Sequence, residues 1–346
     1  KKQSMSLKNL SVKNKIPNQY KTKLLNRRVN SIFNKFQNSF KPESNFIVGV
    51  SGGADSLTLA FLSKLYAFKN DLKPKYYIVD HKLRNNSTEE ALKVKKILKS
   101  LNIHSQILTW KGKKPYNKIQ SSARKKRYDL LFSKCKKLKI HNLVIGHHID
   151  DLFENFFLRM VRGSGLKGLV SLGAETQIGN INLLRPLINI DKKDLLFISK
   201  FVFNFYVDDP SNHNMKFNRI KIRNFMQQLK SIGLDKKKIQ LTIENLKRSD
   251  QTVRFYVEKN KKINSILNQQ KTELILKKDF FDNSYEVVFR SLSDLIHCIG
   301  KKHNPVRGKK IDNILNKIKN KRLFKETLGG CVIKMINHTI ILAKEH

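Results

Sequence analysis

The stretch "FIVGVSGGADS" (Phe46–Ser56) places a turn of two glycines, an aspartate and two serines directly after five apolar or small residues. A short run of this kind is typical of a strand buried on both faces. At Gly52 and Gly53 the backbone is free to take positive φ and to approach a ligand closely. A helix that begins there points its unpaired N–H groups and positive dipole end at the same place. The stretch therefore predicts a phosphate-binding turn between a strand and a helix.

The side chains of this turn indicate what accompanies the phosphate. Ser51 and Ser56 supply hydroxyl donors, whereas Asp55 places a negative charge inside a cradle for anions. Asp55 would repel a phosphate unless a divalent cation or a positively charged partner lies beside it. We therefore expect a cation at Asp55.

Other nucleotide-binding loops fit less well. The kinase-type pattern G-x-x-x-x-G-K-[ST] is absent, which disfavours a loop lysine on the γ-phosphate. A G-x-G-x-x-G pattern exists at Gly163, Gly165 and Gly168, but it follows an expected helix rather than a strand, and this disfavours a dinucleotide fold. A plain glycine turn that joins strand to helix is the remaining alternative.

Short apolar runs alternate with longer amphipathic segments from residue 45 onward. Expected strands lie at 45–50, 76–80, 105–110 and 142–146, and expected helices at 57–68, 88–101, 119–138 and 152–161. This alternation predicts an α/β domain with a doubly wound parallel sheet. Ser87 and Glu90 predict a capping box at the start of one helix. Ligands are expected at the carboxyl ends of the strands.

The flanking segments differ from this domain. Residues up to about 40 are basic, with helical apolar spacing from Leu24 to Phe36, and residues 219–270 are expected to be long basic helices. The C-terminal part predicts a small α+β unit with a short strand in "YEVVF", helices at 291–299 and 309–319, and a closing hairpin of "GGCVIKM" and "TIILA". We therefore expect a basic arm and lead-in helix (1–44), a catalytic domain (45–210), a basic helical region (211–272) and an α+β unit (273–346).

Composition indicates a polyanionic partner. The 346 residues include 70 Lys and Arg against 27 Asp and Glu, a formal net charge of +43, which points to nucleic acid. Lysines at 73–77, 111–114 and 236–262 are together expected to contact a phosphate backbone, although each taken alone fits a solvated face better. Tyr116, Phe255 and Tyr256 lie among basic residues; packing inside the protein is the favoured interpretation, and stacking on unpaired bases is the alternative.

Cysteine usage and hydropathy bear on the environment. Cys135, Cys298 and Cys331 have neither C-x-x-C nor metal-ligand spacing, which fits a reducing compartment. No run of 18 apolar residues and no signal-peptide pattern is present. We expect a soluble cytoplasmic protein, whose first residue, Lys1, leaves open whether the start is trimmed.

Several ordered blocks narrow the interpretation. S-G-G-x-D-S after a strand resembles the pyrophosphate loop of the ATP pyrophosphatases. The further blocks are "VDHKLRNNSTEEA" (79–91), "SSARKKRYDLL" (121–131), "GHHIDDLFEN" (146–155), "RGSGLKGL" (162–169), "LLRPL" (183–187) and "DDPSN...RIKIR" (208–223). In order and approximate spacing they resemble the tRNA(Ile)-lysidine synthetase family. The resemblance runs from about residue 45 nearly to the end of the chain.

The resemblance implies a ligase that joins L-lysine to the wobble cytidine of the isoleucine tRNA with anticodon CAU. ATP would first adenylate the C2 oxygen of cytosine and release pyrophosphate, and the lysine ε-amine would then displace AMP. The product, lysidine, makes the tRNA read AUA as isoleucine rather than AUG as methionine. The implied cofactors are ATP and Mg²⁺, and the partners are free lysine and the tRNA, with a homodimer left open.

The resemblance implies roles for the first blocks. The turn residues assigned to ATP are Ser51, Gly52, Gly53, Ala54, Asp55 and Ser56, with Asp55 also as a catalytic residue and a magnesium ligand. Arg124 and Arg127 share a helix face, and Arg124 is placed to neutralise charge at the α-phosphate; a solvated basic helix is the alternative. Asp80, His81 and Arg84 follow the second strand and are assigned to substrate, although Asp80 or His81 capping the next segment is an equal alternative.

The block at 146–155 brings two histidines and three acids to the same expected edge. Asp151 and Glu154 are three apart and share a helix face, where they would bind the lysine ammonium or a magnesium ion, with Asp151 as the metal ligand. His147 or His148 would accept a proton from the attacking amine. His148 and Asp150 are assigned to substrate binding.

The last block is expected to close over the site from the domain junction. It contributes Asp209, Ser211 and Asn212, and the substrate contacts Arg219 and Arg223. The two arginines are four apart and fit phosphate contacts to the tRNA backbone equally well.

Two other functions remain as alternatives. A base thiolase would share the pyrophosphate loop, but thiolation usually needs paired cysteines or an iron–sulfur cluster, and the three cysteines here are isolated. A non-catalytic RNA-binding protein would keep the charge, but the loop and the His-Asp blocks are complete, which disfavours a decayed site.

Overall fold

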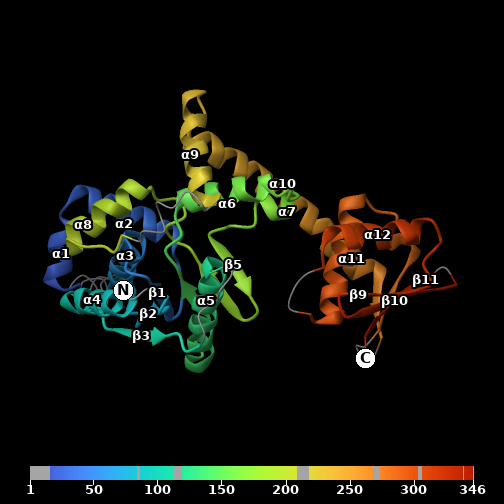
Figure 1. The fold of residues 1–346 in the computed structure, drawn as a ribbon, viewed down its shortest axis with the longest axis horizontal. Helices are drawn as coiled ribbons and strands as arrows, with labels where there is room; N and C mark the ends of the chain where they lie inside the picture. The colour runs from blue at the N-terminus through green and yellow to red at the C-terminus, as the bar shows by residue number, and fades with distance from the viewer. Residues whose placement is uncertain are drawn as a thin grey trace, which may run out of the picture. The chain divides into compact units, whose positions relative to one another are not determined.

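The computed structural model (Figure 1) describes residues 16–83, 86–112, 119–208, 218–268, 273–302, 306–337 and 339–345. The chain divides into two compact units, Lys1–Gln240 and Leu241–His346. Over the described ranges, no helix combines the length and the apolar character that a bilayer crossing requires.

The first unit is built on a six-stranded sheet of order β3-β2-β1-β4-β6-β5. Neighbours from β3 to β6 pair in parallel, and only β5 is antiparallel, as a hairpin with β6. The predicted doubly wound sheet is confirmed. The elements are α1 (Asn18–Leu24), α2 (Arg27–Ser39), β1 (Phe46–Val50), α3 (Ala54–Asn70), β2 (Lys75–Asp80), α4 (Ser87–Ser100), β3 (Ser105–Thr109), α5 (Ile119–Leu138), β4 (Asn142–Val144), α6 (Ile149–Val161), α7 (Leu166–Leu169), β5 (Glu175–Ile178), β6 (Ile181–Leu184), α8 (Lys192–Phe203) and α9 (Asn218–Ser231).

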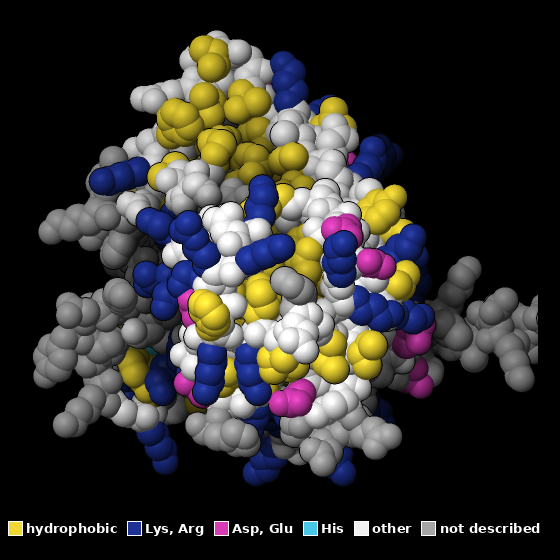
Figure 2. All heavy atoms as spheres, turned by 90° about the vertical axis from the view of Figure 1, so that its right-hand side faces the viewer, with side chains coloured by type: hydrophobic (Ala, Val, Ile, Leu, Met, Phe, Trp, Pro, Cys, Tyr) yellow, Lys and Arg dark blue, Asp and Glu magenta, His cyan; other side chains and the backbone are white. Residues whose placement is uncertain are grey.

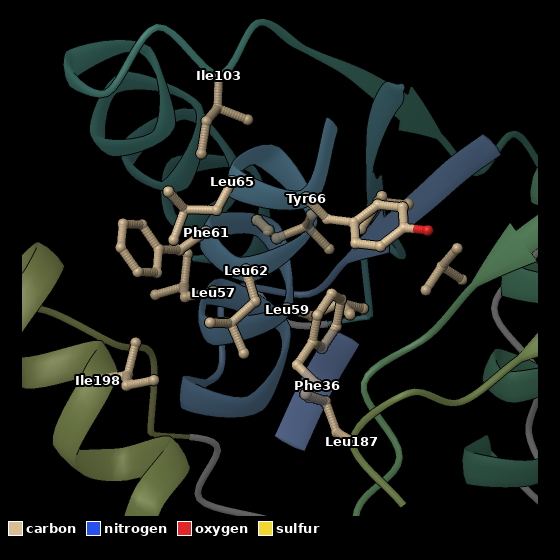
Figure 3. Close-up of a cluster of buried hydrophobic side chains, with 14 of the residues drawn as sticks. Phe36, Leu57, Leu59, Phe61, Leu62, Leu65, Tyr66, Ile103, Leu187 and Ile198 are labelled. Carbon is tan, nitrogen blue, oxygen red and sulfur yellow. The ribbon is translucent and has the colours of Figure 1, made fainter. Parts of the chain in front are cut away.

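Each face of this sheet carries its own core, because successive strand residues point to opposite faces. Val48 and Val50 of β1 pack with α2, α3, α4 and α8, whereas Ile47 packs with α5 on the other face. Figure 3 shows Phe61 and Leu62 of α3 gathered with Phe36 and Ile198 from α2 and α8. Burial on both faces accounts for the continuous apolar run in β1.

The segment before the sheet is part of this core. Its apolar spacing suggested one lead-in helix, but α1 and α2 are separate, because the side chain of Asn26 accepts the backbone N–H groups of Arg28 and Val29 and so caps α2. Phe36 and Phe40, from the end of α2, are almost fully buried. The part of the N-terminal arm at residues 1–15 lies outside the described residues.

The capping box predicted at Ser87 is wrong. Helix α4 starts one residue earlier, with Asn86 as its N-cap, and the backbone N–H of Glu90 donates to the Asn86 carbonyl. The hydroxyls of Ser87 and Thr88 donate instead to the two carboxylate oxygens of Asp80, at 2.8 and 2.7 Å. The start of α4 is thus tied to the end of β2 by a buried acid.

The glycines at 163–168 follow α6 rather than a strand, as expected. The backbone N–H of Gly163 donates to Met160 and that of Ser164 to Arg159, while Gly163 has φ +66°. This pattern ends α6. It confirms that the G-x-G-x-x-G spacing here is not a strand-to-helix phosphate turn.

The basic helical region is shorter than expected. It breaks at Gly233 into α9 and α10 (Lys236–Asn264), and the chain continues as strand β7 (Ser265–Leu267) rather than as helix to residue 270. The boundary between the two compact units falls inside α10. Phe255 and Tyr256 are 65% and 48% exposed on this helix, so the favoured packing interpretation is wrong for them, and Tyr116 lies outside the described residues.

The second unit is a five-stranded antiparallel sheet of order β7-β8-β11-β10-β9 with helices packed on it. The predicted hairpin of β10 (Cys331–Ile336) and β11 (Thr339–Lys344) is confirmed. "YEVVF" is not a strand but the start of α11, because Val288, Leu292 and Leu295 continue a helical period into the core. The remaining elements are β8 (Glu273–Leu276), a 3₁₀ turn at Lys278–Phe280, α11 (Tyr285–Gly300), α12 (Gly308–Lys319) and β9 (Lys325–Leu328).

The aromatic cluster of α2 provides a test of the core. Phe36 is 0% exposed and lies 4.9 Å from Phe40 and 6.4 Å from Tyr66 between ring centroids. Phe36→Ala is expected to lower the free energy of unfolding by about 3–5 kcal/mol, measured by urea denaturation. Leu25→Ala, at a side chain 82% exposed, is the control and should change it by less than about 0.5 kcal/mol. Equal effects of the two substitutions would contradict the described core.

The acid at the end of β2 predicts a pH-dependent stability. Burial raises the pKa of Asp80, but hydrogen bonds from Thr88, the Lys82 amide and Ser87 outweigh it and bring the pKa below its usual value. The stabilisation is therefore present above about pH 4, the unfolded pKa, and is lost as pH falls through the folded pKa.

Thermal melts from pH 7 to pH 2.5 check this expectation. Asp80→Asn should lower the melting temperature at pH 7, and the difference from wild type should shrink towards pH 2.5. Glu89→Gln, at an exposed position of the same helix, is the control. A difference between Asp80→Asn and wild type that stays constant with pH would contradict the role of the charged form.

Candidate active site

A cavity of about 790 Å³ opens in the first unit where the carboxyl ends of β1, β2 and β4 meet. This is the edge at which ligands are expected in an open α/β sheet. The sequence-predicted residues that line it are Ser51, Gly53, Ala54, Asp55, Ser56, Asp80, His81, Arg124, Arg127, His147, His148, Asp150, Asp151, Glu154 and Arg223.

The remaining predicted residues either do not line this cavity or fall outside the described part of the chain. Gly52 lies in the turn without lining it. Arg84, Asp209, Ser211 and Asn212 fall outside the described residues, as does the side chain of Arg219 in α9. Nothing structural is assigned to them.

The two glycines of the turn have different roles. Gly52 has φ +87°, and a Cβ there would lie 2.6 Å from the Val94 side chain, so this position requires glycine for folding. Gly53 has φ −68°, so the positive φ expected there is wrong. A Cβ on Gly53 would meet only the Val207 carbonyl, at 3.9 Å. Gly53 is the N-cap of α3 and faces the cavity, where a ligand can approach the helix N-terminus.

The serines of the turn hold its shape. The Ser56 hydroxyl accepts from the Ser51 amide at 3.1 Å and donates to the Gly53 carbonyl at 3.0 Å. Ser56 is buried, whereas Ser51 is exposed at the cavity. Ser51 is therefore the hydroxyl that an incoming anion meets first.

Asp55 lies beside a cation supplied by the chain itself. Lys192, the first residue of α8, donates its ammonium to both carboxylate oxygens, at 2.6 and 2.8 Å. The expectation that Asp55 needs a positively charged neighbour is thereby met within the described structure. Lys192 is a residue that the sequence analysis missed, because one lysine among 70 basic residues carries no distinguishing pattern.

His148 lies between three carboxylates. Its Nδ1 accepts the backbone N–H of Asp150, and its own backbone N–H donates to Asp151, which makes a capping box at the start of α6. Its Nε2 lies 3.6 Å from Oδ2 of Asp55 and 3.6 Å from Oδ2 of Asp151. His148 thus joins the acid of the first turn to the acids of α6.

His147 lies instead between two guanidinium groups. Its Nδ1 is 3.1 Å from Nε of Arg185, and its Nε2 is 3.1 Å from Nη2 of Arg124. Burial, assisted by Arg124, Arg185 and Arg127 and opposed by Asp151, lowers the pKa of His147 to about 3. The ring is therefore neutral near pH 7.

The acids of α6 already bind cationic groups from later helices. Glu154, 2% exposed, accepts from Nε of Arg223 at 2.5 Å. Asp150 contacts the ammonium of Lys236 at 2.6 Å, and that ammonium also reaches Asp191 at 2.8 Å. Burial opposes the charge on Lys236, but the two carboxylates outweigh it and raise its pKa. This edge of the cavity is thus chemically suited to positively charged nitrogen.

Asp80, the acid at the end of β2, is hydrogen-bonded by the chain itself. Both oxygens of Asp80 accept hydrogen bonds from the chain around the start of α4, as described above. Of the two roles predicted for Asp80, organising the next segment is the one that these contacts support. His81 lines the cavity beside it.

Oxygen donors in the cavity fit magnesium in chemical type. Asp55 and Asp151 carry the hard carboxylate oxygens that Mg²⁺ prefers. Among the described residues, no three His, Cys, Asp or Glu side chains are already arranged around one metal position.

The site can be compared with known proteins. A family model described as a PP-loop domain matches residues 22–229, which includes α2, upstream of the motifs that begin near residue 45. The tRNA(Ile)-lysidine synthase of Orientia tsutsugamushi (strain Boryong) is 32% identical over 320 residues, covering 89% of this chain and 71% of the relative. That of Wolbachia sp. subsp. Brugia malayi (strain TRS) is 32% identical over 321 residues, covering 91% of this chain and 74% of the relative.

A solved structure supports the fold. The U34-tRNA thiolase NcsA from Methanococcus maripaludis, described with its 4Fe-4S cluster, aligns with a TM-score of 0.54 at 17% identity, covering 64% of this chain and 78% of that one. At this identity the likeness concerns the fold alone. With the domain match and the curated relatives taken together, the chain belongs to the tRNA(Ile)-lysidine synthase family of PP-loop proteins.

Proposed function

We propose that this protein forms lysidine in tRNA(Ile), by joining L-lysine to the wobble cytidine of the CAU anticodon at the expense of ATP. The observation that carries the proposal is the shared cavity. One wall is a turn suited to phosphate, and another is a set of acids that hold cationic nitrogen. A reaction between a nucleoside triphosphate and an amine needs both a phosphate-binding turn and acids that bind the amine.

The first step would use the phosphate wall. The C2 oxygen of cytidine attacks the α-phosphorus of ATP, and the bond to pyrophosphate breaks. Gly53 and the N-terminus of α3 face the leaving pyrophosphate, while Arg124 opposes the charge that develops at the α-phosphate. Asp55 and Asp151 would hold Mg²⁺, whose charge offsets that of the phosphates.

The second step would use the acidic wall. The lysine ε-amine attacks C2, the C–O bond breaks and AMP leaves, and the amine loses a proton. The Lys236 ammonium, which contacts Asp150, is the same functional group as the side-chain amine of the lysine substrate, and this contact supports the assignment. Asp151 and Glu154 are the acids we assign to the substrate amine, with a neighbouring histidine as proton acceptor. The modified base would then direct AUA rather than AUG decoding.

The tRNA would be held mainly by charge. Figure 2 shows a face on which Lys and Arg side chains far outnumber Asp and Glu, in keeping with the net charge of +43. The exposed rings of Phe255 and Tyr256 on α10 are suited to stack on unpaired bases. The three cysteines do not line the cavity, so the thiolase alternative lacks the sulfur chemistry it usually requires.

The test of function is transfer of labelled lysine. Wild type incubated with ATP, Mg²⁺, labelled L-lysine and a CAU-anticodon tRNA(Ile) transcript should incorporate label. Asp55→Ala and Arg124→Ala should each lose at least about 100-fold of the rate, because Asp55 would hold Mg²⁺ at the phosphates and Arg124 would oppose the charge that develops at the α-phosphate. Lys137→Ala, near the far end of α5, is the control and should match wild type. Labelling by either variant at the wild-type rate would contradict the role assigned to that residue.

The two glycines of the turn allow folding and phosphate binding to be separated. Gly53→Ala should leave the melting temperature unchanged, because its Cβ has room, but should weaken ATP binding by roughly tenfold or more, measured by calorimetry. Gly52→Ala should lower the melting temperature, because its Cβ meets Val94. Unchanged ATP affinity in Gly53→Ala would contradict a phosphate at this helix N-terminus.

A further inference from the structure

The contacts of His147 determine which of its ring nitrogens carries a proton. Arg185, at the end of β6, is only 6% exposed and is anchored through Nη1 to the Gly173 carbonyl at 3.0 Å and to the Thr176 hydroxyl at 2.8 Å. Its Nε–H points at His147 Nδ1 at 3.1 Å. A guanidinium can only donate hydrogen bonds. Guanidinium groups face both ring nitrogens, and a neutral ring accepts through only one of them. Because Arg185 is fixed by its two further hydrogen bonds, we take Nδ1 as the acceptor. In a neutral ring the proton is then on Nε2.

This tautomer leaves two donors facing each other. The Nε2–H group of His147 lies 3.1 Å from Nη2 of Arg124, which is also a donor. The same Arg124 nitrogen also donates a long hydrogen bond of 3.4 Å to the Tyr128 hydroxyl, and the guanidinium lies 5.5 Å from the Tyr128 ring centroid. Two donors at this separation are stabilised when an oxygen that bears negative charge accepts from both.

Burial and the neighbouring charges keep the His147 ring neutral. Arg124 and Arg127 of α5, Arg185 after β6 and Asp151 of α6 are the charged groups that act on His147. Three of these four are cationic, and the ring is buried, so a second proton on it is disfavoured. Asp151 favours a second proton, but burial and the three arginines outweigh it, so the ring stays neutral near pH 7.

We propose that Arg185 is a positioning residue that holds His147 as a neutral Nε2–H donor, and that His147 and Arg124 together bind an anionic oxygen of the α-phosphate. The inference rests on the proposed function for the identity of that oxygen. It gives His147 the role of a hydrogen-bond donor rather than that of proton acceptor. It also gives a role to the arginine of the "LLRPL" block.

The tautomer can be measured without any substrate. Long-range ¹H–¹⁵N correlation spectra of the full-length protein, with His147 assigned by its loss in His147→Gln, should show a neutral Nε2–H ring that does not titrate between pH 5.5 and 8. His141 is the internal control, because its Nδ1 faces the Asn180 carbonyl at 2.9 Å and must donate. An Nδ1–H tautomer or a titrating ring at His147 would overturn the proposal. Arg185→Gln, if folded, should lose the single tautomer.

The ligand can be probed with two simple anions. AMP carries the α-phosphate and should shift the His147 resonances, whereas inorganic pyrophosphate, bound at the turn, should leave them in place. A shift with pyrophosphate alone, equal shifts with both anions, or none with AMP would overturn the α-phosphate assignment.

Kinetics separate a donor from a base. His147→Gln, which keeps an N–H donor, should retain the lysine-transfer rate within about tenfold, whereas His147→Ala should lose roughly 100-fold or more in kcat. Equal loss in both variants would indicate a proton acceptor and overturn the inference. If wild type transferred no lysine, the proposed function would fail, while the tautomer and AMP measurements would still decide the inference.

Discussion

The site depends on the close approach of the end of β4 to the first turn of α3. A Cβ on Gly146 would lie 3.3 Å from backbone atoms of Asp55 and Ser56, so only the absence of a side chain lets the two segments meet without a shift. Because the strands are parallel neighbours, the turn after β1 and the turn after β4 open at one edge. This contact brings His148 within 3.6 Å of Asp55 and joins the phosphate turn to the acids of α6.

Around this contact, carboxylate side chains alternate with lysine and arginine side chains. Lys192 of α8, Arg223 of α9 and Lys236 of α10 each bind an acid of the cavity. Partly buried carboxylates need such partners, because an unpaired charge is costly away from water. The two substrates of the proposed reaction have opposite charges, and each side of the cavity has groups that complement one of them.

Much of the first unit could be predicted from the sequence. Strands β1 to β4 and the helices between them follow from apolar runs and periodicity, and the motifs placed most site residues at one edge. Asp80 could not be assigned, because its partners Ser87 and Thr88 depend on where α4 starts. Lys192, Lys236 and Arg185 were missed because their roles come from contacts between distant segments. "YEVVF" was mistaken for a strand because a short β-branched run does not reveal the longer helical period around it.

The reaction proposed for the cavity requires ATP to be cleaved between its α- and β-phosphates. The most direct measurement follows the products of α-labelled and γ-labelled ATP after incubation with the protein, lysine, Mg²⁺ and the CAU-anticodon tRNA(Ile). We expect AMP and pyrophosphate in amounts equal to the lysine incorporated. Formation of ADP and orthophosphate, without AMP, would contradict it.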